Sequence, residues 1–170
     1  MAEEKNRYTV LPRVLVFVFK DGKLLMMKYS GKGENMSQEK LDRKDIHNCI
    51  GGHVEKGEDV IETAVKEAQE EAGIKLLNPK VRGIINISGF AEKDIINFII
   101  SGTTEDEPIK SSLEGDLEWI KTEQLKDINI FSDIVPILEK VLSLEDEEMF
   151  VGSAEFNGKF KLLNINLRTI

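Results

Sequence analysis

The fold of this chain is decided by residues 51–74, which read GGHVEKGEDVIETAVKEAQEEAGI. Asp59, with Glu62 three residues later, forms a capping-box pattern and predicts that a helix begins here. Gly73 is typical of the left-handed residue that ends a helix. Between these caps, apolar residues recur at helical spacing and predict one buried face: Ile61, Ala64, Val65, Ala68 and Ala72. The stretch therefore predicts a glycine turn that leads into an amphipathic helix.

Three glutamates lie on a different face of the predicted helix. Glu67, Glu70 and Glu71 have the i, i+3, i+4 relation, so a single turn brings their carboxylates together. On an exposed helix each like-charge pair costs roughly 0.2–0.5 kcal/mol, and a divalent cation would remove that cost. Oxygen ligands without cysteine or histidine suit Mg²⁺ or Mn²⁺ and not zinc. The alternative is a solvated acidic face; the adjacent glycines, which allow a close approach to an ion or phosphate, favour the metal site.

The spacing of these residues resembles the Nudix box, G-x5-E-x7-R-E-U-x-E-E-x-G-U, where U is a bulky or aliphatic residue. In this chain the box covers residues 52–74. Two positions differ, because Lys66 stands where Arg is usual and Ala68 is small for a U position. Lysine keeps the charge but lacks the planar fork that holds a carboxylate at two points. We therefore expect a less firmly oriented Glu58 or Glu70, with activity retained.

The order of strands and helices also resembles the Nudix fold. The resemblance implies an α+β chain in which a mixed β-sheet is sandwiched between α-helices, an α/β/α sandwich. We expect residues 1–170 to form a single domain. Segments 11–14, 48–55 and 113–120 further resemble a bacterial MutT-like group of nucleoside triphosphate pyrophosphohydrolases. The resemblance is weaker over residues 30–46 and in the last third of the chain.

Local patterns predict the elements around the box. The apolar run 14–19 predicts a central strand, and Asp21-Gly22 predicts a tight hairpin to a partner strand over 23–28. Asn78-Pro79 predicts a turn, and Asn157-Gly158 predicts a second hairpin. The other expected elements are strands 81–88, 95–101, 117–120, 149–156 and 159–166, a helical turn 122–125, and a helix 133–144 capped by Ser132.

Residues 29–46 form a long polar segment between the second predicted strand and the glycine turn. Loops of this length inside a compact domain are usually functional or disordered. We expect either a lid or substrate wall, or a mobile insertion.

The resemblance implies a role for each charged residue of the box. It implies that the metal ligands are Glu67, Glu70, Glu71 and the backbone carbonyl of Gly51. Glu58 would orient a ligand or hold the loop. The metal ions would neutralise phosphate charge and lower the pKa of the attacking water.

A further carboxylate often enters such a site from outside the box. Glu114, five residues before Trp119, matches that position best and would bind metal or act as the general base. Asp116 and Glu118 are close alternatives, and a solvated loop is a third.

Candidate substrate-binding residues lie on both sides of the box. In MutT-like sanitising enzymes an asparagine precedes the double glycine, so the resemblance implies that Asn48 hydrogen-bonds a purine edge beside Gly52. The equal alternative is an asparagine that supports the turn. Phe131 and Asp133 are candidates for a stacking ring and a base-edge acceptor, with core packing and helix capping as the favoured alternative.

The histidines and the cysteine are weaker candidates. His47 and His53 have no Cys or Asp partner in a spacing that suggests a zinc site or a catalytic triad. Cys49 has no evident activating base, so we expect a small packed residue.

Composition limits the partners. A net charge of −8 argues against a nucleic acid polymer, but a small nucleotide that carries its own Mg²⁺ remains compatible. A single cysteine excludes an internal disulfide and favours a reducing cytoplasm. The first residues lack signal-peptide character and no apolar run is long enough to span a bilayer. We expect no membrane association, and a monomer or a homodimer.

The leading hypothesis is a Mg²⁺-dependent Nudix pyrophosphohydrolase that converts a nucleoside triphosphate, such as the oxidised purine 8-oxo-dGTP, to monophosphate and pyrophosphate in nucleotide pool sanitation. The same chemistry on ADP-ribose, a dinucleoside polyphosphate or a nucleotide sugar is the first alternative. The second is a non-catalytic Nudix domain that senses a nucleotide; the complete set of box glutamates argues against it. The catalytic Cys and Glu pattern of an isopentenyl diphosphate isomerase is missing.

Overall fold

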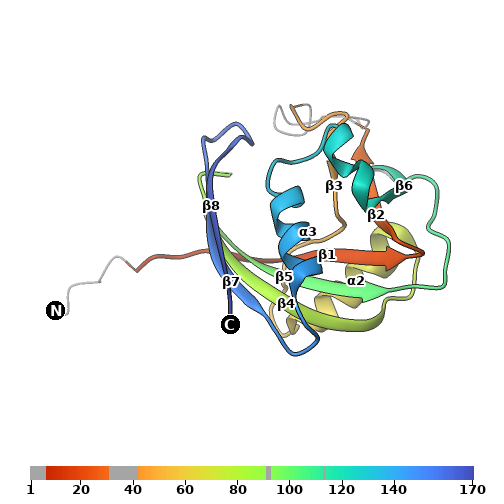
Figure 1. Cartoon of the computed structure of the whole chain (residues 1–170), viewed down its shortest axis with the longest axis horizontal. Helices are drawn as coiled ribbons and strands as arrows, with labels where there is room; N and C mark the ends of the chain where they lie inside the picture. The colour runs from red at the N-terminus through yellow and green to blue at the C-terminus, as the bar shows by residue number, and fades with distance from the viewer. Residues whose placement is uncertain (1–6, 31–41, 91–92, 113) are drawn as a thin grey trace.

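The computed structural model describes residues 7–30, 42–90, 93–112 and 114–170 (Figure 1). Most of the segment 29–46, for which a lid or an insertion was expected, lies outside the described residues. No described helix combines the length and apolar character that crossing a bilayer requires. In chain order, the elements are β1 (Leu11–Lys20), β2 (Lys23–Tyr29), β3 (His47–Asn48), α2 (Val60–Ala72), β4 (Leu77–Ser88), β5 (Ile95–Thr103), β6 (Gly115–Lys121), the 3-10 helix η1 (Thr122–Asp127), α3 (Ile134–Ser143), β7 (Phe150–Phe156) and β8 (Leu162–Thr169).

A single mixed sheet contains all the described strands. Its order is β3-β2-β1-β5-β4-β7-β8, and β6 pairs along the whole of β2, from Lys23 to Tyr29. β1 runs parallel to β5 and β4 runs parallel to β7, whereas the other pairings are antiparallel. The apolar strand that the sequence predicted to be central, β1, indeed lies between two neighbours.

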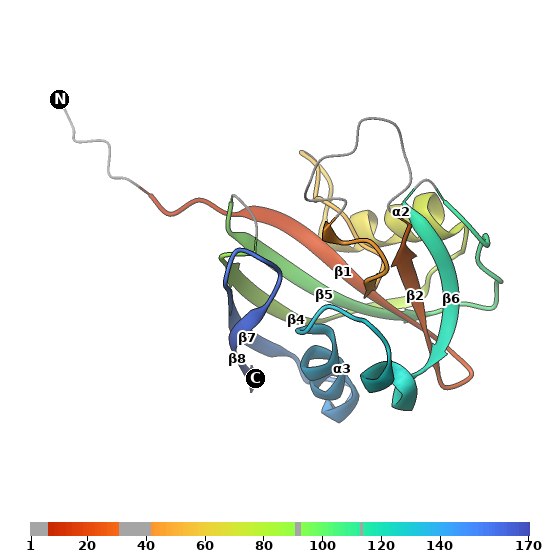
Figure 2. The ribbon, with the colours of Figure 1, turned by 90° about the horizontal axis from the view of Figure 1, so that it is seen from above.

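The sheet has a hydrophobic core on each face, because side chains alternate along its strands. In β1, Val14, Val16 and Val18 pack with the alanines of α2, whereas Leu15 and Phe17 pack with residues of α3 on the other face. Figure 2 shows the strands lying between the two helices. The expected α/β/α sandwich is confirmed.

Both predicted hairpins are confirmed. Asp21 and Gly22 have φ of 49° and 72°, the two positive values that a two-residue turn with right-handed twist requires. Asn157-Gly158 joins β7 to β8, but β8 begins only at Leu162, so the expected start at residue 159 was wrong. Phe160, with φ of 58°, extends the turn.

Two other local predictions were wrong. The expected turn at Asn78-Pro79 is part of β4, where a positive φ at Asn78 and a register shift make a local irregularity and the strand continues. Ser132 does not cap the following helix, because its hydroxyl accepts a hydrogen bond from Leu162 N–H at 3.0 Å. The residue before α3 is Asp133, which makes no side-chain cap bond.

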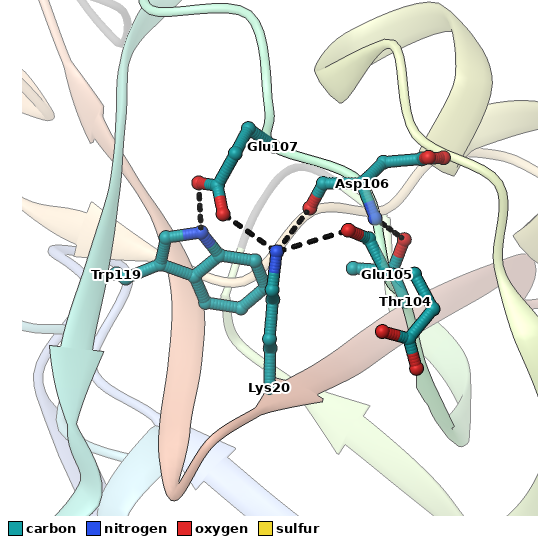
Figure 3. Close-up of polar contacts among 6 residues, drawn as sticks. All are labelled: Lys20, Thr104, Glu105, Asp106, Glu107 and Trp119. Carbon is teal, nitrogen blue, oxygen red and sulfur yellow. Dashed lines mark hydrogen bonds and ion pairs between the residues drawn. The ribbon is translucent and has the colours of Figure 1, made fainter.

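Lys20 clamps the acidic loop that leads from β5 to β6 (Figure 3). An ammonium group has three donors. Here Lys20 Nζ donates to the carbonyl oxygens of Glu105 and Asp106, at 3.0 and 3.1 Å, and to the Glu107 carboxylate. The other Glu107 oxygen accepts from Trp119 Nε1 at 3.1 Å. The clamp thus ties the loop to the end of β1 and to β6.

Candidate metal centre and active site

The caps of α2 set the direction in which the box glutamates point. Asp59 Oδ1 accepts from the N–H groups of Ile61 and Glu62 at 2.8 and 2.9 Å, and Glu62 Oε2 accepts from Asp59 N–H at 3.0 Å. At the other end Gly73 has φ of 67°, the expected left-handed cap. The predicted capping box and C-cap are confirmed. Because the helix begins and ends at these residues, its buried alanine face and its glutamate face have fixed directions.

Gly52 and Glu67 lie in direct contact. A Cβ at position 52 would overlap with the Glu67 carboxylate, so a glycine is needed for this carboxylate to rest on the turn. Gly52 therefore lies beneath a candidate metal ligand, and it is not among the residues that line the neighbouring cavity.

Gly51 makes a second link between the turn and the helix. Its N–H donates to Glu71 Oε2 at 3.1 Å. A Cβ at position 51 would overlap with the carbonyl oxygen of Val14, because the turn pairs closely with β1. The two adjacent glycines thus let the turn lie between β1 and the glutamate face of α2.

Burial and neighbouring charge disfavour ionisation of Glu71. Burial raises the pKa of its carboxyl to about 8, the hydrogen bond from Gly51 N–H lowers the pKa, and the charges of Glu114 and Glu67 raise it again. A divalent cation would favour the ionised form. The Glu71 carboxyl is therefore one whose ionised form a nearby cation would stabilise.

Glu67 shares this environment. Its pKa is raised by burial first and then by the charge of Glu70, while Lys66 lowers it. Glu70 itself is exposed. Among the described residues, no three His, Cys, Asp or Glu side chains lie close enough together to hold a metal ion, so the helical turn does not by itself bring the three carboxylates to one point. The donor chemistry still suits Mg²⁺, which prefers oxygen ligands and completes its shell with waters and substrate phosphates.

Glu58 is held in place by two residues of α2. Lys66 Nζ donates to Glu58 Oε1 at 2.9 Å, and Thr63 Oγ1 donates to Glu58 Oε2 at 3.0 Å. The Lys66 hydrogen bond, followed by the Thr63 hydrogen bond, lowers the pKa of Glu58. The sequence left Glu58 and Glu70 as the two carboxylates that Lys66 could orient. In the structure Lys66 binds Glu58.

Of the three acidic candidates outside the box, Glu114 is the one whose charge acts on the box glutamates. Its charge raises the pKa of both Glu67 and Glu71. Glu118 is engaged elsewhere, because its carboxylate contacts His47 Nε2 at 2.8 Å. Asp116 lies opposite Lys28 in the sheet.

A cavity beside the glycine turn brings together Asn48, Phe131 and Asp133, three residues proposed separately from the sequence. Gly51 also lines it. The volume is about 50 Å³, room for a few ordered waters. Phe131 is buried, with 3% of its surface exposed, and its ring centroid lies 5.7 Å from that of Phe90.

The side-chain amide of Asn48 has a defined orientation. Its Oδ1 accepts from Cys49 N–H at 2.9 Å, which requires the oxygen and not the nitrogen at that place. The amide also hydrogen-bonds the Tyr29 hydroxyl, which lowers the pKa of Tyr29 against the larger effect of burial. A bond that lowers the pKa of Tyr29 is one in which the Asn48 NH₂ group donates, so one further N–H of this group remains for a ligand.

Asp133 has a buried carboxyl in this cavity. Burial raises its pKa from 3.8 to about 6, although a hydrogen bond to its own backbone amide opposes the shift. Because the side chain makes no cap bond, the helix-capping alternative for Asp133 was wrong. Cys49 is buried and its pKa is raised by that burial, which agrees with the expected packed thiol.

Sequence reasoning missed several polar residues of the cavity, among them Arg13 and Asn97. Arg13 lines it and lowers the pKa of Glu67 and Glu71. Asn97 lines it as well, and Asn97 Oδ1 is buried with no hydrogen-bond partner among the described residues. Arg13 belongs to a segment that resembles the MutT-like group, which is a usable signal. Nothing in the sequence marks Asn97, because its position follows from the parallel pairing of β1 with β5.

Known proteins of one family resemble this chain. The model of a family described as NUDIX domain matches residues 10–141. The "Uncharacterized Nudix hydrolase YvcI" of Bacillus subtilis (strain 168) is 25% identical over 126 residues, which cover 69% of this chain and 76% of that protein.

Solved structures extend the likeness to three dimensions. The MutT protein from Bacillus halodurans has a TM-score of 0.76 and 26% identity, covering 93% of this chain and 97% of that chain. The MutT protein from Methanosarcina mazei Go1, at 19% identity, shares the fold with a TM-score of 0.64, covering 79% of this chain and 94% of that chain.

Proposed function

The chain belongs to the Nudix family, and from that premise we propose that it hydrolyses a nucleoside triphosphate to the monophosphate and pyrophosphate with Mg²⁺ or Mn²⁺. Membership supports the coarser statement, hydrolysis of pyrophosphate bonds in small nucleotide substrates. The observation that carries the finer one is the place of Gly51. Its backbone lines the cavity with Asn48 and Asp133, and its N–H donates to Glu71. One nucleotide can thus reach the cavity and the glutamates together.

The proposed metal ligands are Glu67, Glu70, Glu71 and the backbone carbonyl of Gly51. A bound divalent ion would neutralise phosphate charge and lower the pKa of the attacking water. Gly52 allows the Glu67 carboxylate to rest against the turn. Arg13, on the cavity side, brings positive charge towards the same carboxylates and suits an anionic substrate.

Two other glutamates have different proposed roles. Glu58 is held by Lys66 and Thr63, so it fixes the loop before the helix and does not reach for the substrate. Glu114 is exposed and close enough to raise the pKa of the box glutamates, which supports a role as general base or as an additional ligand.

The cavity is the proposed nucleobase site. The NH₂ group of Asn48 would donate to an acceptor on the base edge, since its oxygen is already bonded to Cys49 N–H. Asp133, with a pKa near 6, could accept from a base N–H or donate to an acceptor. Asn97 offers a carbonyl oxygen without a partner in the described residues. This mixture of donors and acceptors supports a purine, including an oxidised purine such as 8-oxo-dGTP, and hence nucleotide pool sanitation.

Product analysis over a substrate panel tests the proposal. The panel contains ordinary and 8-oxo purine triphosphates, ADP-ribose, a nucleotide sugar and a dinucleoside tetraphosphate, each with Mg²⁺, with Mn²⁺ and with a chelator. Glu70→Gln removes a proposed ligand charge, and Glu123→Gln, an exposed glutamate on η1, is the matched control. Loss of the ligand should cost more than the roughly 10–100-fold that follows loss of an outer partner.

Monophosphate and pyrophosphate released from a triphosphate, in a metal-dependent reaction lost in Glu70→Gln alone, would support the proposal. Turnover of only ADP-ribose, a nucleotide sugar or the dinucleotide would overturn the base-reading role of Asn48. Nucleotide binding without turnover of any substrate would favour a sensor.

A further inference from the structure

His47 joins the two segments that carry the cavity residues. The side chain is buried, with 7% of its surface exposed. Its ring makes two contacts in opposite directions: Nδ1 with the carbonyl oxygen of Asn129 at 2.8 Å, and Nε2 with Glu118 Oε1 at 2.8 Å. β3, the segment 129–131 and β6 therefore meet at one imidazole.

The two partners fix the direction of this ring. A backbone carbonyl only accepts hydrogen bonds, so Nδ1 donates to Asn129 O. Nε2 faces the Glu118 carboxylate, and the ring cannot turn without losing one of the two contacts. Such a ring has one orientation.

The residues on either side of this junction are the candidate base-reading residues. Asn48 follows His47 directly, and Phe131 and Asp133 come two and four residues after Asn129. We propose that His47 is a positioning residue, held by Glu118, that sets the spacing of Asn48 against Phe131 and Asp133 across the cavity. This inference rests on the proposed function, because it concerns how the same cavity recognises a nucleotide.

Main-chain bonds separate this role from a merely structural one. His47 N–H donates to Asn129 O at 2.8 Å, and Phe131 N–H donates to His47 O at 3.2 Å. These bonds connect the two segments whatever the side chain at position 47 is. Loss of the imidazole should therefore change the relative orientation of the two segments without disconnecting them. We expect a larger effect on substrate binding than on folding.

The test compares His47→Leu, Glu118→Leu and Glu118→Gln with the wild type. Glu118 is half exposed, at 52% for its side chain, so its variants should fold even where His47→Leu does not. Glutamine keeps an acceptor oxygen for His47 Nε2 and is the conservative rescue. Asn129→Ala is the control, because it removes the side-chain bond from Nδ2 to Asp45 O and keeps the backbone carbonyl that binds His47.

With the best nucleotide of the panel, His47→Leu and Glu118→Leu should raise KM about tenfold, the lower range for a lost polar fit, with kcat within about threefold. The differences in kcat/KM among nucleotides with different bases should become smaller. Glu118→Gln and Asn129→Ala should stay near the wild type. Unchanged KM in both leucine variants, a fall in kcat alone, or an equal effect of Asn129→Ala would overturn the proposal.

Amide hydrogen exchange gives a readout that does not depend on turnover. In the leucine variants the amide of Cys49, which donates to Asn48 Oδ1, should lose protection, whereas the amides of His47 and Phe131 should keep theirs, because their main-chain bonds remain. Unchanged protection at Cys49 would overturn the positioning role. If the wild type hydrolyses no nucleotide, the proposed function fails, and binding of GMP and AMP to the same variants decides the role of His47 alone. A weaker affinity in the leucine variants supports it, and equal affinities reject it.

Discussion

The Glu67 carboxylate rests on the Cα of Gly52, in the space that a side chain at position 52 would need. Gly52 and Glu67 are fifteen residues apart in the sequence (67 − 52) and in contact in the structure. This contact explains on steric grounds why the turn has no side chain there.

Gly52→Ala should therefore displace Glu67 and lower the activity by about 100-fold, the effect of moving a reacting group by about 1 Å. Mn²⁺ affinity, measured by calorimetry, should fall as well. In a Glu67→Ala background the same glycine substitution should cost little more, because the displaced carboxylate is gone. Full additivity of the two substitutions would show that Gly52 acts in another way.

The ion pair between Lys66 and Glu58 can be tested by changing the lysine alone. Lys66→Arg should preserve the pair and raise kcat modestly, since the guanidinium can hold Glu58 at both oxygens. Lys66→Met should lower metal affinity or activity by about 10–100-fold. The thermal midpoint should change little in either variant, because the Lys66 side chain is 40% exposed and an ion pair in contact with solvent adds little stability. Equal activity of the arginine and methionine variants would contradict this account.

Asp133 should make stability depend on pH. Its pKa is raised from 3.8 to about 6, so between these values the folded state binds more protons than the unfolded state. Stability therefore falls as the pH rises from about 4 to about 6. Asp133→Asn should remove this loss and stabilise the protein at pH 7 by up to about 3 kcal/mol, at 1.36 kcal/mol per unit.

Urea denaturation of the wild type and Asp133→Asn across pH 4–8 measures the effect. The difference between the two free energies of unfolding should grow from pH 4 to pH 6 and then become constant. Other carboxyl groups cancel in that difference. A difference that does not vary with pH would mean that Asp133 is as well solvated as in the unfolded chain.

The Lys20 clamp should protect the acidic loop between β5 and β6 (Figure 3). Lys20→Met removes all three hydrogen bonds to Glu105, Asp106 and Glu107. A protease that cleaves after glutamate should then cut at Glu105 and Glu107 faster than in the wild type. Lys121→Met, which changes an exposed lysine on β6, is the control. Equal cleavage rates in the two variants would argue that the clamp does not hold the loop.

Elements whose signals are local were predictable from the sequence. The capping box at Asp59 and Glu62, the left-handed Gly73 and the Asp21-Gly22 hairpin depend on residues within a few positions of one another. Ser132 shows the limit of such signals, because a hydroxyl that suits a helix cap instead binds Leu162 N–H, 30 residues away. The Ser132 hydroxyl thus binds a backbone N–H that is distant in the sequence, and not one at the start of the adjacent helix.

Residue spacing also supplied the family and the candidate glutamates, since residues three and four positions apart lie on the same face of any helix. It could not supply the cavity. Asn48 and Asp133 lie 85 positions apart (133 − 48), and their meeting depends on the order of the strands and on the place of α3.

The sequence by itself determined the box helix, its caps, the hairpins and the family, because each rests on contacts between near neighbours along the chain. Only the tertiary structure decided that Gly51 binds Glu71, that Glu118 belongs to His47 and that Asn129 completes this junction, over 20, 71 and 82 residues. The physical reason is that strand order and register are set by burial over the whole sheet, and no local pattern encodes which distant side chains that burial brings together.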